Sequence, residues 1–134
     1  MSQRLVFSLK SSPNYVDGRR LAVCEIESIS QDAVALTFEN SSIGDAELRA
    51  LPHLPKLRCL DLDGTAITDQ SLVVVGHMAS LEELWLECTA ISDNGLEALH
   101  GTQSLRFISL AYTAATSQGI GALRAALPLA EVSA

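Results

Sequence analysis

The sequence is poor in aromatic residues and has no apolar run of membrane-spanning length. Aromatic side chains make up 4% of its 134 residues, so aliphatic side chains must fill the core. No 18-residue apolar stretch occurs, which excludes a membrane-spanning helix. The first 15 residues lack the roughly 7–15-residue apolar segment of a signal peptide. These absences predict a globular domain that is neither secreted nor inserted in a membrane.

Cysteine is also scarce, and sequence motifs for chemistry are missing. Cys24, Cys59 and Cys88 are odd in number and form no C-x-x-C pair, which predicts reduced thiols and a cytoplasmic protein. There is no glycine-rich phosphate loop, no D-x-D-x-D-G calcium loop and no zinc-ligand spacing. No histidine or carboxylate is spaced to activate a nucleophile. We therefore predict no catalytic residue, no metal ligand and no cofactor.

Basic residues are outnumbered, and the imbalance lies in one part of the chain. The net charge is −7, and residues 33–134 hold five basic and twelve acidic side chains. A surface of this sign repels phosphate backbones and anionic lipids, which argues against nucleic acid and membrane partners. It favours a basic partner.

A 24-residue repeat is the main feature that the sequence does contain. Residues 57–80 read LRCLDLDGTAITDQSLVVVGHMAS, and residues 81–104 read LEELWLECTAISDNGLEALHGTQS. Both have leucine at positions 1, 4 and 6, threonine at 9, isoleucine at 11, aspartate at 13 and apolar residues at 16 and 19. The same frame predicts copies at residues 33–56 and 105–128. The last copy has Ala115 for the isoleucine and Ser117 for the aspartate, which predicts a thinner core near that end.

The spacing within one copy predicts a strand, a turn and a short helix. The change from spacing three to spacing two places a strand at positions 3–7, with Leu60 and Leu62 inward and Cys59 and Asp61 outward. Serine or threonine followed by aspartate at positions 12 and 13 predicts a helix N-cap. The position-9 hydroxyl, as in Thr65, is expected to satisfy backbone groups at the turn.

This spacing resembles the leucine-rich repeat, L-x-x-L-x-L-x-x-N/T-x-I, and within it the 24-residue class with T-x-I-[ST]-D. That class is similar to the cysteine-containing repeats of F-box adaptor proteins and to short bacterial repeat proteins. The resemblance implies an α/β solenoid, a right-handed superhelix with parallel strands on its concave side and short helices on its convex side. It also implies non-enzymatic recognition of a protein or peptide through the concave face. No F-box sequence is present, so the ubiquitin-adaptor role is not carried over.

The chain divides into three expected regions. Residues 1–32 form an N-terminal cap, residues 33–128 form four repeats, and residues 129–134 form a closing strand with Leu129 and Val132. For the cap we expect two short strands, Gln3–Leu9 and Arg20–Ile26, as a hairpin. The alternative is a strand followed by a helix over Arg19–Ile29.

The residues at positions 3, 5, 7 and 8 of the repeats form the predicted concave face. Residues 24 apart lie side by side on neighbouring strands, about 4.8 Å apart. Aromatic side chains would anchor a partner, and adjacent carboxylates would receive its basic side chains. Solvation or a metal ion would be other ways to offset the repulsion among these carboxylates. The predicted partner-binding residues are Asp61, Asp63, Glu83, Trp85, Glu87, Phe107, Ser109 and Tyr112.

Two other functions remain open at this point. The chain would be a scaffold subunit if it self-associated into a homo-oligomer through a terminal edge or a convex patch. An enzyme is the third alternative, and the missing motifs disfavour it.

Overall fold

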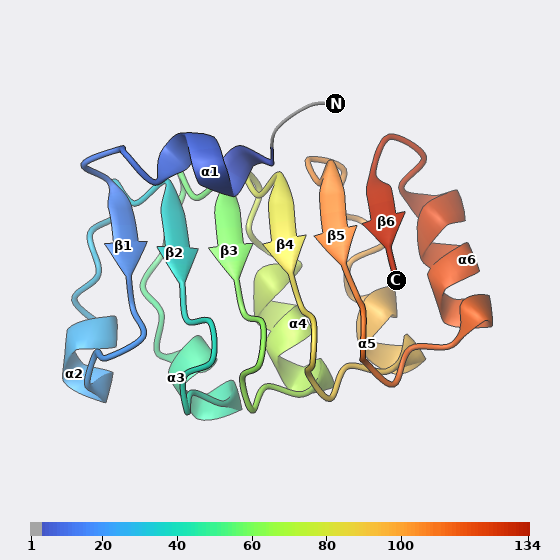
Figure 1. Cartoon of the computed structure of the whole chain (residues 1–134), viewed down its shortest axis with the longest axis horizontal. Coiled ribbons are helices and arrows are strands. Elements are labelled where there is room, and N and C mark those ends of the chain that lie inside the picture. Colours follow the sequence, from blue (N-terminus) through green and yellow to red (C-terminus); the bar gives the residue numbers. More distant parts are fainter. Residues whose placement is uncertain (1–3) are drawn as a thin grey trace.

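Short parallel strands and short helices alternate along residues 4–134, the part of the chain that the computed structural model describes (Figure 1). The strands are β1 (Tyr15–Asp17), β2 (Ala35–Thr37), β3 (Cys59–Asp61), β4 (Glu83–Trp85), β5 (Phe107–Ser109) and β6 (Glu131–Ser133). The helices are α1 (Leu5–Leu9), α2 (Val23–Ile26), α3 (Asp45–Arg49), α4 (Asp69–Val75), α5 (Asp93–Glu97) and α6 (Ser117–Ala126). All six strands join one sheet in chain order.

The register of the sheet follows the 24-residue repeat. Ala35 pairs with Cys59, Cys59 with Glu83, Glu83 with Phe107, and Phe107 with Glu131. Each strand occupies positions 3 to 5 of its copy, two residues fewer than predicted. The predicted leucine-rich-repeat architecture, with a parallel sheet and one short helix per copy, is confirmed.

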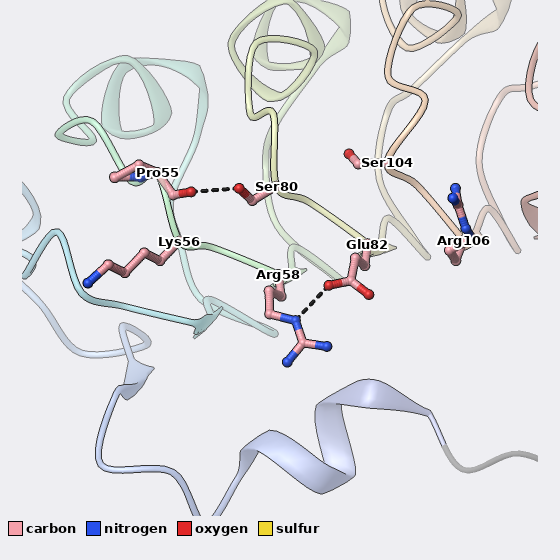
Figure 2. A pocket seen from close by; sticks show the side chains of 7 residues that line it. All are labelled: Pro55, Lys56, Arg58, Ser80, Glu82, Ser104 and Arg106. Atoms are coloured by element: carbon pink, nitrogen blue, oxygen red, sulfur yellow. Dashed lines mark hydrogen bonds and ion pairs between the residues drawn. The ribbon is translucent and has the colours of Figure 1, made fainter.

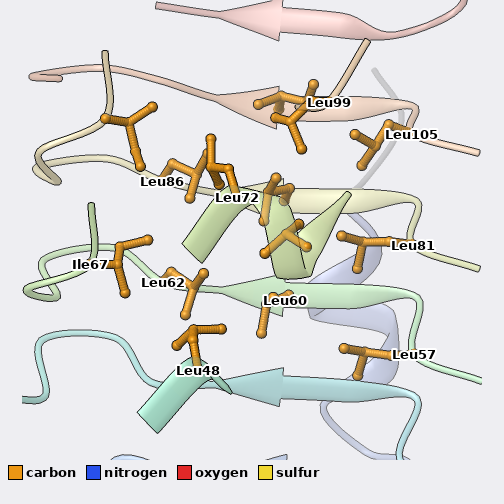
Figure 3. Packing of buried hydrophobic residues seen from close by; sticks show 14 of the residues in the cluster. Leu48, Leu57, Leu60, Leu62, Ile67, Leu72, Leu81, Leu86, Leu99 and Leu105 are labelled. Atoms are coloured by element: carbon orange, nitrogen blue, oxygen red, sulfur yellow. The ribbon is translucent and has the colours of Figure 1, made fainter. Parts of the chain in front are cut away.

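The core consists of the repeated aliphatic positions, stacked along the sheet (Figure 3). The side chains at positions 1, 4, 6, 11, 16 and 19 of the two clean copies are all 0% exposed. They are Leu57, Leu60, Leu62, Ile67, Leu72, Val75, Leu81, Leu84, Leu86, Ile91, Leu96 and Leu99. One copy cannot bury these side chains alone, so the stacking of copies is what holds the chain together.

The last copy is packed more loosely, as its smaller residues predict. Ala115 is half-buried, whereas its equivalents Ile67 and Ile91 are fully buried, and Ile120 is half-buried, whereas its equivalents Leu72 and Leu96 are fully buried. β6 then pairs with β5, and Val132 enters the core at 7% exposure. Leu129 does not, because it lies outside on the approach to β6 and is 71% exposed.

The N-terminal region differs from the prediction. The expected strand at Gln3–Leu9 is instead helix α1 from Leu5 on, and residue 3 lies outside the described part of the chain. The expected strand at Arg20–Ile26 is replaced by helix α2, as in the alternative. β1 lies between these helices and pairs in parallel with β2, Tyr15 opposite Ala35. A hairpin is therefore wrong, since a hairpin requires antiparallel strands.

β1 and α2 form a shortened first coil of the solenoid. Residues paired between β1 and β2 are 20 apart in the sequence, compared with 24 between the later strands. Gly18 occupies the position at which the later coils have an inward-facing phenylalanine or leucine, such as Phe38 or Leu62. The fully buried ring of Phe38 occupies the space that a Gly18 side chain would need. A large residue in one coil thus compensates for a missing side chain in its neighbour.

Polar residues that follow the strands make two kinds of contact. Within one coil, the position-9 threonines donate to the leucine carbonyl three residues back, as Thr65 does to Leu62 at 2.7 Å, whereas the Ser41 hydroxyl has no partner among residues 4–134. The position-13 carboxylates reach the following coil instead of capping their own helix, because Asp69 Oδ1 accepts from the Ser92 amide at 2.7 Å. The N-cap prediction therefore holds for Thr68, which accepts from the Gln70 amide, but not for the aspartates.

Candidate functional site: a cleft on the concave face

Helix α1 covers part of the concave face. In Figure 1 it crosses the sheet near the starts of β2 and β3. Val6 is buried against Ala35 and Cys59, which are small enough to admit it, and Trp85 borders this contact. The position-3 residues, expected to face solvent, are therefore covered by the chain's own N-terminal helix.

Beside α1 the concave face is hollowed into a cleft of about 470 Å³. One wall is α1, the floor is the outward face of β1 to β4, and the far rim follows the residues just after the strands. The lining residues are Val6, Phe7, Lys10, Tyr15, Asp17, Arg19, Thr37, Glu39, Asp61, Asp63 and Trp85. Aromatic rings and carboxylates thus face the same space, the combination that attracts a cation.

Backbone amides donate hydrogen bonds to the carboxylates of Asp61 and Asp63, and the neighbouring negative charges affect one another. Asp61 Oδ1 accepts from the Asp63 amide at 3.0 Å, and Asp63 Oδ1 accepts from the Glu87 amide at 2.7 Å. Glu87 in turn accepts from the Ser109 hydroxyl at 2.6 Å. These bonds connect Asp61 and Asp63, which lie on the coil of β3, with Glu87 on the coil of β4. In this paper Glu39, Asp61, Asp63 and Glu87 are called the acidic row.

Two members of the acidic row are hard to ionise. Burial raises the pKa of Asp61 to about 6, and the charges of Glu39 and Glu87 add to this effect. Burial and the charge of Asp61 raise the pKa of Asp63 to about 7. Lys10 acts in the opposite direction on Asp61. The row therefore gains most from a neighbour that brings positive charge.

The predicted site residues divide into three groups in the structure. Asp61, Asp63 and Trp85 line the cleft. Glu83 and Phe107 lie beneath the N-terminal segment, at 3% and 7% exposure, and are not open to solvent as expected. The reason is that α1 was expected to be a strand beside the first repeat and is instead a helix lying on the sheet.

The third group, Glu87, Ser109 and Tyr112, does not line the cleft. Ser109 is buried and supports Glu87, whereas Tyr112 is 85% exposed. Tyr112 has a φ of 60°, as part of a left-handed turn that recurs after each strand at position 8. That turn directs its ring away from the sheet row, and it does not line the cleft.

Trp85 lies between α1 and the acidic row. Its indole Nε1 donates to Glu83 Oε1 at 2.7 Å, and its ring is tilted by 54° against Phe107 at a centroid distance of 5.0 Å. The ring is half-buried, so part of it remains available to a ligand in the cleft.

Sequence reasoning missed the wall of the cleft. Val6, Phe7 and Lys10 come from α1, and Tyr15 comes from β1, in the region expected to form a cap. A signal was available in the spacing of Leu5 and Leu9, four residues apart with Val6 between them, which is the spacing of one helix face.

A second hollow, of about 560 Å³, lies at the edge where the chain enters the strands (Figure 2). It carries the basic residues Lys56, Arg58 and Arg106. Arg58 pairs with Glu82 at 2.6 Å, and Lys56 pairs with Asp32 at 2.7 Å. Exposed ion pairs of this kind are already neutralised and well solvated, so this hollow is the weaker candidate for a site.

Residues 4–134 contain neither a cluster of metal-ligating side chains nor a helix that could cross a membrane. No cluster of three or more His, Cys, Asp or Glu side chains in this part of the chain is placed to hold a metal ion. None of its helices combines the length and the apolar character that crossing a lipid bilayer requires.

Comparison with known proteins identifies the repeats. The family model described as Leucine Rich repeat matches residues 53–76 and residues 77–99, which overlap the two clean copies of the sequence. No curated protein matches the chain. The family assignment thus rests on the repeats, and the role of the cleft must be argued from its geometry.

Proposed function

Because this chain is a leucine-rich-repeat protein, we propose that it is a non-enzymatic interaction module that binds a basic protein or peptide in the cleft of the concave face. Leucine-rich repeats generally mediate protein–protein interactions, and they do so through an extended concave surface. The partner would insert a lysine or arginine side chain between Trp85 and the acidic row.

The observation that carries this proposal is the lack of a cationic partner for the acidic row. The ion pairs among residues 4–134 join Arg4 to Glu131, Arg19 to Asp17, Lys56 to Asp32 and Arg58 to Glu82. None of them involves Asp61 or Asp63, although burial makes these two carboxylates the most costly to leave charged. A ligand cation in the cleft would relieve that cost.

The proposed roles follow from position in the cleft. Asp61 and Asp63 would accept the charged group, and Trp85 would contact its aliphatic stem or its cation. Glu87 would extend the acidic surface beyond the cleft, towards Ser109 and Tyr112. Roles for Glu83 and Phe107 require that α1 moves, because both are covered by the N-terminal segment.

Trp85 provides the test, because it is the single tryptophan of the sequence and lines the cleft. We expect an oligolysine peptide at low ionic strength to change the fluorescence of Trp85 in a saturable manner. Asp63→Asn should weaken this binding by roughly tenfold, a loss of about 1.4 kcal/mol. Trp85→Ala should weaken the binding as well, and because this variant has no tryptophan its affinity is measured by calorimetry.

Glu97→Gln is the matched control, because Glu97 is an exposed carboxylate on helix α5, outside the cleft. In a titration at about pH 8 or above, where Asp63 is ionised, it lowers the negative charge by the same amount as Asp63→Asn. Equal losses in the two variants would mean that the peptide senses only net charge, and the cleft would then have no special role. No binding at all would also contradict the proposal.

Self-association as a scaffold subunit is the alternative that the sequence left open. Light scattering over a wide range of protein concentration distinguishes the two. A molar mass that stays at 14.3 kDa at all concentrations counts against the scaffold, and a mass that rises with concentration supports it.

A further inference from the structure

Helix α1 is held on the concave face by a complementary surface, here called the α1 seat. The seat consists of Ala35, Cys59, Glu83, Trp85 and Phe107, contributed by four neighbouring strands. Val6 enters it at 7% exposure, whereas the next residue of the helix, Phe7, is 53% exposed. One face of α1 is therefore bound and the other faces outward.

The polar centre of the seat is Glu83. Its carboxylate accepts from the Leu5 amide at 2.7 Å, from the Val6 amide at 3.1 Å and from the Trp85 indole at 2.7 Å. A carboxylate at 3% exposure needs such donors, because a buried charge without them is strongly destabilising. Two of these three donors belong to α1 and leave with it.

Cations flank the same helix on both sides. The Arg4 guanidinium lies 4.1 Å from the centroid of the Phe107 ring and 3.3 Å from the Glu131 carboxylate. Lys10 follows the other end of α1, lines the cleft, and its charge acts on Asp61. The helix thus brings positive charge to an acidic surface, as the proposed partner would.

Nothing in α1 itself makes the helix stable. It has five residues, whereas isolated helices shorter than about 12 residues are marginal in water. Its N-cap residue, Arg4, makes no side-chain capping bond, so Glu83 replaces the cap from a distant part of the chain. The helix therefore forms only while it is seated, and leaving the seat unfolds it.

From these contacts we infer that α1 is an internal occupant of the partner-binding face, and that a short basic amphipathic helix of a partner protein displaces it. The inference rests on the proposed function and extends it. The partner helix would place an apolar side chain against Ala35 and Cys59, offer its first amides to Glu83, and lay a cation on Phe107. The cleft and the seat then become one continuous binding surface, closed by α1 in the unbound protein.

Displacement has a measurable consequence for affinity. A segment tethered to its own site competes at an effective concentration of about millimolar, so an outside helix of equal quality binds weakly. Its apparent dissociation constant equals the intrinsic one divided by the fraction of molecules whose seat is open. Loosening α1 should thus strengthen binding in trans.

The probe for the experiment is a fluorescently labelled peptide with the sequence of residues 1–12, MSQRLVFSLKSS. It is titrated with the full-length protein, and its anisotropy is measured. We expect at least tenfold tighter binding to Val6→Asp, in which α1 no longer fits the seat, than to the unaltered protein. Equal binding to both proteins, or no binding to Val6→Asp, would overturn the inference.

Val73→Asp is the matched control, since it makes the same substitution at an exposed valine of helix α4, away from the seat and the cleft. It should bind the peptide as weakly as the unaltered protein does. Ala35→Leu in the Val6→Asp background should abolish binding by filling the seat. If Val6→Asp is unfolded by circular dichroism, Arg4→Glu replaces it, with the same direction of change expected and the same result overturning the inference.

This result is separable from that of the proposed function. The oligolysine titration reads the acidic row and Trp85, and it does not require α1 to leave the seat. If oligolysine binds but the peptide does not bind more tightly to Val6→Asp, then α1 does not leave the sheet. The cleft would remain the proposed interaction site in that case.

Discussion

Asp61 and Asp63 lie side by side at the centre of the concave face, and both titrate near neutral pH. Their carboxyl groups keep the proton up to about pH 6 and pH 7 in the folded protein, because burial and neighbouring charge disfavour the ionised form. The unfolded chain releases the same protons near its ordinary value of 3.8. The two residues therefore link the stability of the fold to pH.

The first prediction concerns this linkage. Between about pH 4 and pH 7 the folded state binds more protons than the unfolded state, so the free energy of unfolding should decrease as the pH rises. We expect a loss of about 1–3 kcal/mol over this window, measured by urea denaturation at several pH values. Asp17, whose ion pair with Arg19 lowers its pKa to about 2, contributes only below it.

Asp63→Asn is the variant that isolates the effect. The amide oxygen of asparagine still accepts the Glu87 backbone bond, but the side chain has no proton to lose. Its unfolding free energy should vary less with pH than that of the unaltered protein. The same pH dependence in both proteins would show that other groups are responsible.

At the scale of single elements, the starts of α4, α5 and α6 are each fitted to the aspartate of the coil before them. Asp93 accepts from the Thr116 amide at 2.8 Å, and its side chain lies over Gly119, in the first turn of α6. A methyl group built on Gly119 would lie 2.8 Å from Asp93 Cβ. Gly121, two residues later in the same helix, has no atom within 4 Å of such a methyl group.

These two glycines give the second prediction. Gly121→Ala should raise the free energy of unfolding by about 0.5–1 kcal/mol, because alanine favours the helix. Gly119→Ala should lower it, despite the same helix propensity, because the methyl group displaces the Asp93 carboxylate. Thermal or urea unfolding of both variants provides the comparison.

A double-mutant cycle assigns the cause. In an Asp93→Ala background the methyl group meets no carboxylate, so Gly119→Ala should then behave like Gly121→Ala. If Gly119→Ala still destabilises the protein in that background, the contact with Asp93 is not the reason.

The sequence predicts the elements that depend on local periodicity, but not the contacts that form between neighbouring coils. The aliphatic positions are local and periodic, so Leu60, Leu62 and their equivalents predict strand, core and stacking correctly. The aspartates at position 13 have the composition of an N-cap, and only the neighbouring coil shows that they bind across it. Their role depends on a contact 23 residues away.

Helix α1 is the element that sequence reasoning missed. Leu5, Val6 and Leu9 have the spacing of one helix face, but five residues are too few to show a clear period, and the alternation of Gln3–Leu9 favours a strand. Its helical state depends on Glu83, 78 residues away from Leu5, and on the small side chains of Ala35 and Cys59. Without α1 the sequence predicts that Glu83 and Phe107 are open to solvent, whereas the structure covers them and leaves Asp61, Asp63 and Trp85 lining the cleft.

At the scale of the whole molecule, the charge of −7 surrounds a cleft whose floor is also acidic. Charges of one sign that converge on a hollow raise the local concentration of ions of opposite sign. The field falls within a Debye length, which is about 10 Å at 0.1 M salt. Association with a basic partner should therefore be fast at low salt and slow at high salt.

This gives the third prediction. The association rate constant of oligolysine, measured by stopped-flow fluorescence of Trp85, should fall by at least tenfold between about 0.02 M and 0.5 M salt. Polyglutamate and double-stranded DNA should give no signal at any salt concentration, since both carry negative charge. Binding of DNA at low salt would contradict the assignment of the surface.

The fit between Phe38 and Gly18 makes the boundary between the first two coils a place where no further coil can be inserted. Repeat proteins lengthen by duplicating a coil, and the coils with Leu62 and Leu86 can be copied side by side because each leucine stacks on an equivalent leucine. A coil inserted between β1 and β2 would part Phe38 from Gly18 and leave a void beside the glycine. Duplication in this protein is thus permitted in the middle of the chain, and the boundary between the first two coils stays fixed.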